Sequence, residues 1–208
     1  MNQLDPIIQA TNFAAIKHKD QRRKDASKTP YINHPIEVMT LLSKSGVTDV
    51  NTLMAGVLHD TIEDTQTSYE EIKEMFGENA ANIVQECTDD KSLPKVERKQ
   101  LQIEHAKVAS MSAQMVKLAD KFSNLKDLQS NPPKSWSPAA IEGYVVWSYN
   151  VYKAIKNSPN SCPAKEILEN NLLNLFKTFT SLNVTLMDEL TLEEKLITYY
   201  KTLSLSSY

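Results

Sequence analysis

The chain of 208 residues is 41% hydrophobic and 24% charged, which is typical of a soluble globular protein and excludes a disordered or collagen-like chain. Its formal net charge of −3 excludes a general electrostatic attraction to nucleic acid or to an anionic membrane. It contains only four glycines and no GxGxxG or GxxxxGK motif, so a glycine-rich phosphate-binding loop is excluded as well.

Apolar residues recur every three or four positions along almost the whole chain, which predicts an all-α fold. The first helix is expected to open at Asp5-Pro6 and to bury four apolar side chains, Ile7, Ile8, Phe13 and Ile16. The next two are expected to start at Pro35 and after Asp49. A short helix is predicted to start at one of two capping boxes, Thr67-x-x-Glu70 or Ser68-x-x-Glu71, and to end before Gly77. A long helix is predicted from Ser137-Pro138 to Lys156. Other helices are predicted around 79–88, 95–109, 112–128, 164–181 and 188–203.

Cysteine use and the absence of long apolar stretches favour a cytoplasmic protein. Cys87 and Cys162 stand far apart, which argues against a disulfide framework or a zinc knuckle. The N-terminal residues lack the charged and then apolar order of a secretory signal. No stretch approaches the roughly 20 apolar residues of a membrane span, so we expect neither a membrane nor a nucleic-acid partner.

Polar and acidic residues are concentrated directly after the predicted third helix. His59, Asp60, Glu63 and Asp64 lie within six positions, and no Lys or Arg occurs between Lys44 and Lys73. Burying such charges without partners costs several kcal/mol, so either they face water or a cation lies among them. The simpler interpretation is a helix end that continues into a solvated acidic loop.

A metal ion would need more ligands than one His-Asp pair supplies, and two candidates lie elsewhere. His34 stands at the start of the predicted second helix, and Asp120 is a single carboxylate in an otherwise apolar helical stripe. Taken alone, His34 could be a capping histidine and Asp120 a partner of Lys117 or Lys121.

In this order and spacing, His34-Pro35, His59-Asp60, Glu63-Asp64-Thr65 and Leu118-Ala119-Asp120-Lys121 resemble the HD-domain hydrolases of the RelA/SpoT class. The likeness is closest to the short stand-alone SpoT-type hydrolases of animals, and it covers roughly residues 5 to 157. It implies an HD-domain helical bundle. We therefore predict a hydrolase domain over 1–157, followed over 158–208 by a linker and a C-terminal helical extension that packs on or beside it.

The resemblance implies a metal centre with four ligands, His34, His59, Asp60 and Asp120. The metal of this family is Mn²⁺, which accepts mixed nitrogen and oxygen ligands, although the ligand set alone would also accept Fe, Co or Zn. Glu63 and Asp64 then match the acidic pair that acts on the attacking water.

The implied substrate is anionic, and residues 17–28 carry six Lys or Arg side chains against two Asp. A solvated basic surface or a nuclear-import patch is the alternative reading of that segment. By resemblance, the substrate-binding residues are Arg23, Lys24, Lys95, Asn124 and Tyr144. Animal relatives tend to carry an arginine where this chain has Ala140, so the phosphate contact is expected to be weaker or to come from Lys91 or Lys134.

The predicted function is Mn²⁺-dependent hydrolysis of the 3′-pyrophosphate of (p)ppGpp, which releases GDP or GTP and pyrophosphate, without synthetase activity. The alternatives are removal of the 2′-phosphate of NADPH in the same site, a generic HD nucleotidase, and a non-catalytic binding module. The expected partners are the nucleotide and, as an option left open, a second copy of the chain. The segment beyond about 181 matches nothing in the family, and a lid, a dimer contact and a packing cap are all compatible with it.

Overall fold

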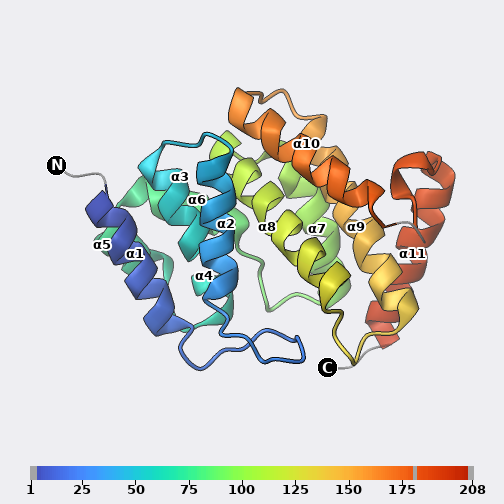
Figure 1. The fold of residues 1–208 in the computed structure, drawn as a ribbon, viewed down its shortest axis with the longest axis horizontal. Helices are drawn as coiled ribbons and strands as arrows, with labels where there is room; N and C mark the ends of the chain where they lie inside the picture. Colours follow the sequence, from blue (N-terminus) through green and yellow to red (C-terminus); the bar gives the residue numbers. More distant parts are fainter. Residues whose placement is uncertain (1–3, 180–181, 206–208) are drawn as a thin grey trace.

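A computed structural model describes residues 4–179 and 182–205, and within them the chain forms helices joined by loops, with one isolated antiparallel bridge between Arg22 and Pro30 (Figure 1). The prediction of an all-α fold is confirmed. The helices are α1 (Leu4–Lys17), α2 (Asn33–Lys44), α3 (Val50–Leu58), α4 (Thr61–Asp64), α5 (Tyr69–Phe76), α6 (Glu78–Cys87), α7 (Lys95–Val108), α8 (Met111–Ser130), α9 (Pro138–Lys156), α10 (Pro163–Lys177), the 3-10 helix η1 (Val184–Leu186) and α11 (Glu189–Leu205).

Three predicted helix starts are fixed by side-chain caps. Asp49 accepts a hydrogen bond from the Thr52 backbone N–H at the start of α3. The hydroxyl of Ser137 accepts one from Ala140 at the start of α9. Of the two capping boxes considered for α5, the one that begins at Ser68 is used.

Some details of the prediction were wrong. Ile8 and Ile16 are 64% and 58% exposed, because α1 packs on α3 through a narrow stripe that buries Ala10, Phe13 and Ala14. The helices α4 and η1 were not predicted, since elements of three or four residues are too short to show a helical period. The helix expected over 164–181 ends at Lys177, and positions 180–181 lie outside the described residues.

α8 is the central helix of the fold (Figure 1). It packs against α2, α3, α6, α9 and α10. Its neighbour α3 is buried from Thr52 to Leu58. These two helices position the polar residues of interest, because His59 and Asp60 directly follow α3 and Asp120 lies midway along α8. The candidate site is therefore held by the most deeply buried part of the fold.

The C-terminal helices pack against the rest of the protein. α10 packs on α8, and α11 packs on α9 and α7. Leu172 and Phe176 of α10 and Leu192 and Tyr199 of α11 are buried in the same hydrophobic cluster as the residues of α3 and α8. The proposed division of the chain at residue 157 stays a prediction.

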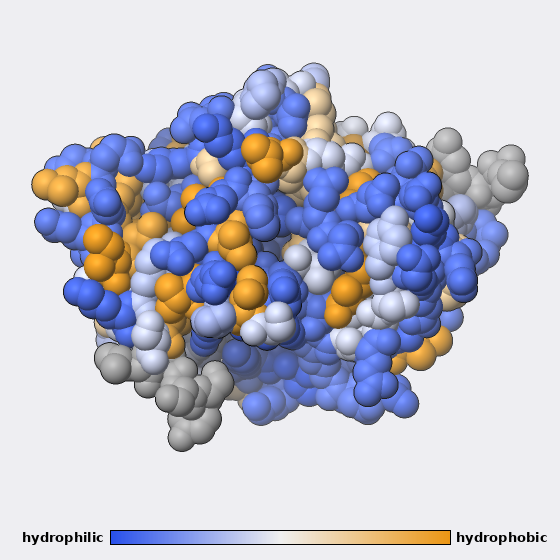
Figure 2. Space-filling model, turned by 180° about the vertical axis from the view of Figure 1, so that it is seen from behind, coloured by the Kyte–Doolittle hydropathy of each residue, from blue (hydrophilic) through white to orange (hydrophobic). Residues whose placement is uncertain are grey.

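Hydrophobic residues are scattered among hydrophilic ones on the face of the molecule shown in Figure 2. Among the described residues, no helix is both long enough and apolar enough to cross a membrane.

Candidate active site

The four predicted metal ligands converge from three separate segments of the chain. His34 comes from α2, His59 and Asp60 from the end of α3, and Asp120 from α8. The Nε2 atom of His34 lies 3.1 Å from Asp120 Oδ1 and 3.6 Å from Asp60 Oδ2. The Nε2 atom of His59 lies 3.1 Å from Asp60 Oδ2 and 3.7 Å from Asp120 Oδ1. Two nitrogens and two carboxylate oxygens thus face one another.

Hydrogen bonds on the far side of each imidazole determine which nitrogen carries the proton. The Nδ1 atom of His59 lies 2.9 Å from the carbonyl oxygen of Gly56, to which it can only donate. The Ser123 hydroxyl donates to Glu37 at 2.7 Å and therefore accepts from Nδ1 of His34 at 2.9 Å. Both Nε2 atoms are left as buried acceptors without a hydrogen-bond donor. Two lone pairs aimed at two carboxylates fit a bound cation, which would remove the repulsion.

Replacing Ser123 by Ala removes the acceptor that holds His34 in this orientation. We expect the affinity for the divalent metal to fall about 10- to 100-fold, as is usual when a partner of a metal-binding histidine is lost. Calorimetric titration of the metal-free protein with the metal ion measures this change. Ser130→Ala, an exposed serine on the same helix, is the matched control and should bind metal normally. Equal affinities for the two variants would contradict the assigned role.

The carboxylates of the cluster are held by further neighbours. The hydroxyl of Tyr31 donates to Asp60 Oδ2 at 2.6 Å. Asp120 Oδ2 accepts a hydrogen bond from Lys121 Nζ at 2.7 Å. Asp120 Oδ1 faces the histidines and accepts a hydrogen bond from the Asn124 side chain. Burial by itself would raise the pKa of Asp120, but the adjacent Lys121 ammonium holds that pKa below its usual value. Asp120 is therefore both a partner of Lys121 and available to a cation.

Glu63 and Asp64 lie beside the cluster on α4 and differ in environment. Glu63 is half-buried and accepts a hydrogen bond from the Asp89 backbone N–H at 3.2 Å. Burial, together with the negative charges of Asp89 and Asp60, raises the pKa of Glu63 to about 7. Asp64 is exposed and accepts hydrogen bonds from Gln21 at 2.8 Å and Lys91 at 2.6 Å. In the metal-free protein Glu63 therefore ionises near neutral pH.

The raised pKa of Glu63 implies that ionising this group destabilises the metal-free protein. The folded state binds the proton up to about pH 7, whereas the unfolded state releases it near the ordinary value of 4.5, so stability is lost as pH rises between these values. Glu63→Gln should remove this loss and stabilise the metal-free protein by about 3 kcal/mol at pH 8, with little effect near pH 4.5.

Thermal unfolding in a chelator, followed at several pH values, measures this difference. Glu70→Gln, at an exposed position of α5, is the control and should keep the pH dependence of the unchanged protein. A Glu63→Gln variant with the same pH dependence as the unchanged protein would contradict the assigned environment.

Two connected cavities adjoin this cluster. The smaller, about 160 Å³, is lined by His59, Asp60 and Asp120. The larger, about 750 Å³, extends away from them toward the N-terminal end of α9. Residues that line both are Tyr31, Glu63, Asp64, Lys99, Asn124 and Tyr144. The acidic pair therefore lies where a ligand in the large cavity would meet the metal cluster.

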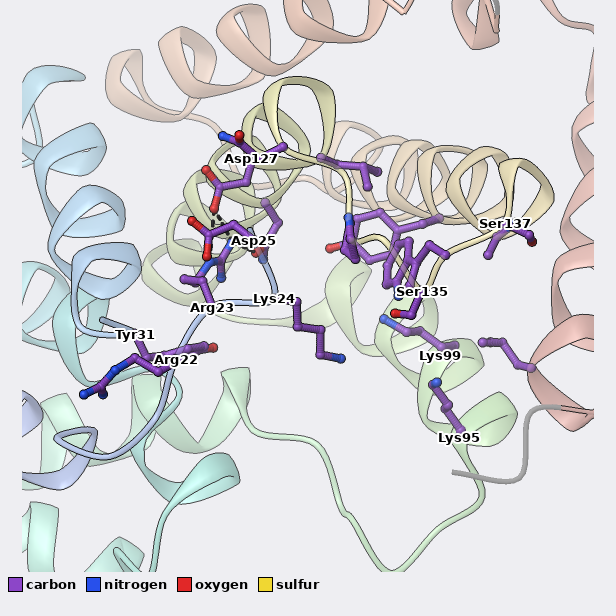
Figure 3. Close-up of a pocket in the computed structure, with 18 of the residues that line it drawn as sticks. Arg22, Arg23, Lys24, Asp25, Tyr31, Lys95, Lys99, Asp127, Ser135 and Ser137 are labelled. Atoms are coloured by element: carbon purple, nitrogen blue, oxygen red, sulfur yellow. Dashed lines mark hydrogen bonds and ion pairs between the residues drawn. The ribbon is translucent and has the colours of Figure 1, made fainter. Parts of the chain in front are cut away.

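All five predicted substrate-binding residues line the larger cavity. Arg23 is anchored, since its guanidinium donates to Asn124 at 3.0 Å and to Asp127 at 2.6 Å. Lys24 and Lys95 are exposed, and Figure 3 shows them reaching into the cavity from opposite sides, Lys24 from the N-terminal loop and Lys95 from α7. The basic residues thus surround space that an anionic ligand can occupy.

The loop that carries Arg23 and Lys24 is held in a fixed turn. Asp25 accepts hydrogen bonds from the backbone N–H and the hydroxyl of Thr29, at 3.0 and 2.6 Å. The backbone N–H of Arg23 donates to the carbonyl of Thr29 at 2.9 Å. Lys28, at the tip, adopts a left-handed conformation with φ of 53°. The turn places both basic side chains beside the cavity without a glycine.

The sequence reasoning missed several residues of the site. Lys99 lines both cavities, and its Nζ lies 3.4 Å from the centre of the Trp147 ring. Burial, reinforced by the charge of Lys121, lowers the pKa of Lys99 to about 7. Its spacing of four from Lys95 puts both on one side of a helix, which was an available signal. No comparable signal pointed to Ser123 or Tyr31.

Ala140, where animal relatives tend to carry an arginine, lines the larger cavity. Neither Lys91 nor Lys134, which were suggested as substitutes for the arginine of the relatives, is among the lining residues, and Lys91 is paired with Asp64. In the part of the chain that the structure describes, Lys24, Lys95 and Lys99 are the lysines that line this cavity.

Comparisons with known proteins identify the family of this chain. The family model described as HD domain matches residues 10–149. The guanosine-3′,5′-bis(diphosphate) 3′-pyrophosphohydrolase MESH1 of Xenopus tropicalis is 50% identical over 171 residues, which are 82% of this chain and 92% of that protein. The human protein of the same name is 45% identical over 172 residues, 82% of this chain and 93% of its own.

A solved structure described as a metazoan ortholog of SpoT that hydrolyzes ppGpp and plays a role in starvation responses has a similar fold. It superposes with a TM-score of 0.76 at 43% identity, over 83% of this chain and 94% of that one. The chain therefore belongs to the HD-domain family, and within it to the group of the animal MESH1 proteins.

Proposed function

We propose that this protein hydrolyses the 3′-pyrophosphate of ppGpp and pppGpp, releasing pyrophosphate and GDP or GTP. The observation that carries the proposal is the placement of Glu63 and Asp64 between a cluster of four candidate metal ligands and a cavity lined by basic side chains. The names of the relatives, which state this same reaction, support it.

His34, His59, Asp60 and Asp120 would hold the metal ion. Ligand atoms of His34, His59 and Asp120 lie within 4.8 Å of one another, and Asp60 Oδ2 lies 3.6 and 3.1 Å from the two histidine nitrogens, which lack donors. We take the ion to be Mn²⁺, for which a mixed set of imidazoles and carboxylates is suitable. Such an ion polarises a phosphoryl oxygen and increases the acidity of water.

Glu63 and Asp64 are the groups proposed to orient the attacking water and accept its proton. Glu63, which lines both cavities, is the proposed proton acceptor. Asp64 is kept in place by Gln21 and Lys91. General base catalysis of this kind contributes about 10²- to 10⁴-fold to a rate.

The basic side chains are proposed to bind the phosphates and to stabilise the negative charge of the departing pyrophosphate. Lys99 is the best placed for the reacting end, since it lines both cavities, while Lys24 and Lys95 line the larger one alone. Tyr144 and Asn124 line both and are proposed to contact the nucleoside and its ribose.

Hydrolysis of several nucleotides by the same metal-loaded preparation tests this proposal. With Mn²⁺, kcat/KM is expected to be highest for ppGpp among ppGpp, NADPH, dAMP and cyclic GMP. Preference for dAMP or cyclic GMP would overturn the proposal in favour of a generic nucleotidase. Preference for NADPH would support the 2′-phosphatase alternative. The metal content of the protein as purified, before any metal is added, tests the proposal of Mn²⁺. A sizing column tests whether the protein forms the homodimer that the sequence left open.

A further inference from the structure

One wall of the larger cavity comes from the C-terminal helix α11. Tyr199, Thr202 and Leu203 line this cavity together with Ala140 and Tyr144 of α9. The HD-domain match ends at residue 149, well before α11 begins. The wall is therefore an addition to the part of the chain that defines the family.

Close packing holds α11 against α9. Gly143 makes room for Tyr199, because a Cβ added at Gly143 would lie 2.2 Å from Tyr199 Cδ2. Tyr199 is 4% exposed. Ion pairs join the same two helices, Lys195 to Glu142 and Lys153 to Glu189. The α11 wall, defined here as Tyr199, Thr202 and Leu203, thus has a fixed position beside the cavity.

The α11 wall lies away from the reacting end of the site. None of its three residues lines the smaller cavity with His59, Asp60 and Asp120. Its side chains are uncharged, in contrast to Lys95 and Lys99 on the neighbouring helix α7. A neutral surface with an aromatic ring and an aliphatic side chain suits the base of a nucleotide, and the phosphates are better matched by the lysines.

We propose that the α11 wall contacts the base of the bound nucleotide and contributes to its binding. This inference rests on the proposed function, since it assumes a nucleotide whose 3′-pyrophosphate lies at the metal cluster. Contacts to a remote part of a substrate that are the same in the ground and transition states change KM and leave kcat unchanged. The effect of altering the wall should therefore appear in KM.

Leu203→Ala tests the wall, with Ile197→Ala as the matched control. Both replace an aliphatic residue of α11 by Ala, but Ile197 is 46% exposed and does not line the cavity. We expect Leu203→Ala to raise KM for ppGpp about tenfold with kcat unchanged. Ile197→Ala should leave KM unchanged. Thermal unfolding of both variants shows whether each is folded.

A folded Leu203→Ala variant with the KM of the unchanged protein would overturn the inference. Failure of the proposed function looks different, because the unchanged protein would then not turn over ppGpp at all. In that case the Kd of ppGpp, measured by calorimetry for the two variants, decides the role of the wall. Equal Kd values, or no binding, would overturn it.

Discussion

Replacing Glu63 by Gln together with Asp64 by Asn is expected to slow ppGpp hydrolysis by about 10²- to 10⁴-fold without loss of metal. Glu63→Gln keeps an oxygen that can accept from the Asp89 backbone N–H. Asp64→Asn keeps one oxygen for Lys91 and gives up the bond from Gln21, which is a contact at the surface, so the fold should be retained. The two replacements remove the two carboxylates that can accept a proton. The measurement is kcat under saturating ppGpp, with metal content and thermal unfolding determined on the same sample.

The matched control is Glu70→Gln with Glu74→Gln, which removes two exposed carboxylates from α5. It changes the net charge equally and should leave kcat unchanged. If the Glu63 and Asp64 double variant retains full activity, these residues do not act on the water, and the assignment of the proton acceptor is wrong.

His59→Ala is expected to abolish most of the metal-dependent activity. The variant removes one of the two buried Nε2 atoms that face Asp60 and Asp120, and leaves three candidate ligands. Since a catalytic metal ion stabilises the transition state by several kcal/mol, the loss in kcat/KM should be about 10³-fold or more. The activity that remains should equal that of the unchanged protein in a chelator. Metal analysis of the purified variant should show a reduced content.

His105→Ala serves as the control, because His105 is exposed on α7 and does not line either cavity. Its metal content and kcat/KM should match those of the unchanged protein. A His59→Ala variant that binds metal with unaltered stoichiometry and affinity would contradict the proposed ligand set.

Much of the fold follows from local sequence signals. Helical periodicity, together with the caps at Asp49, Ser68 and Ser137, placed most helices within a few residues of their observed ends. The burial of α1 was less predictable. Ile8 and Ile16 satisfy the helical period, but which side of α1 packs on α3 depends on tertiary contacts that no local pattern specifies.

The metal cluster could be anticipated from the sequence because its residues are unusual where they stand. Asp120 interrupts an apolar stripe, and His59 and Asp60 end a buried helix. The orienting partners could not be anticipated in the same way. Ser123 and Glu37 lie 86 positions apart, and ordinary Ser and Glu residues carry no sign that they will meet behind His34.

The α11 wall could not be predicted from the sequence either. Its residues have the composition of any amphipathic helix, and the segment was compatible with a lid, a dimer contact or a packing cap. What relates it to the site is the close approach of Tyr199 to Gly143, a contact between positions far apart in the chain. Lys99 was overlooked for another reason, since a lysine on a helix is usually a solvated residue.

Hydrolysis of ppGpp in water enriched in ¹⁸O, followed by analysis of both products, tests the central claim most directly. If the protein is a metal-dependent 3′-pyrophosphohydrolase, one equivalent of pyrophosphate forms for each GDP, and the ¹⁸O is found in the pyrophosphate. The reaction should stop in a chelator and resume on addition of Mn²⁺. Release of orthophosphate in place of pyrophosphate, or an unchanged rate in the chelator, would contradict the account.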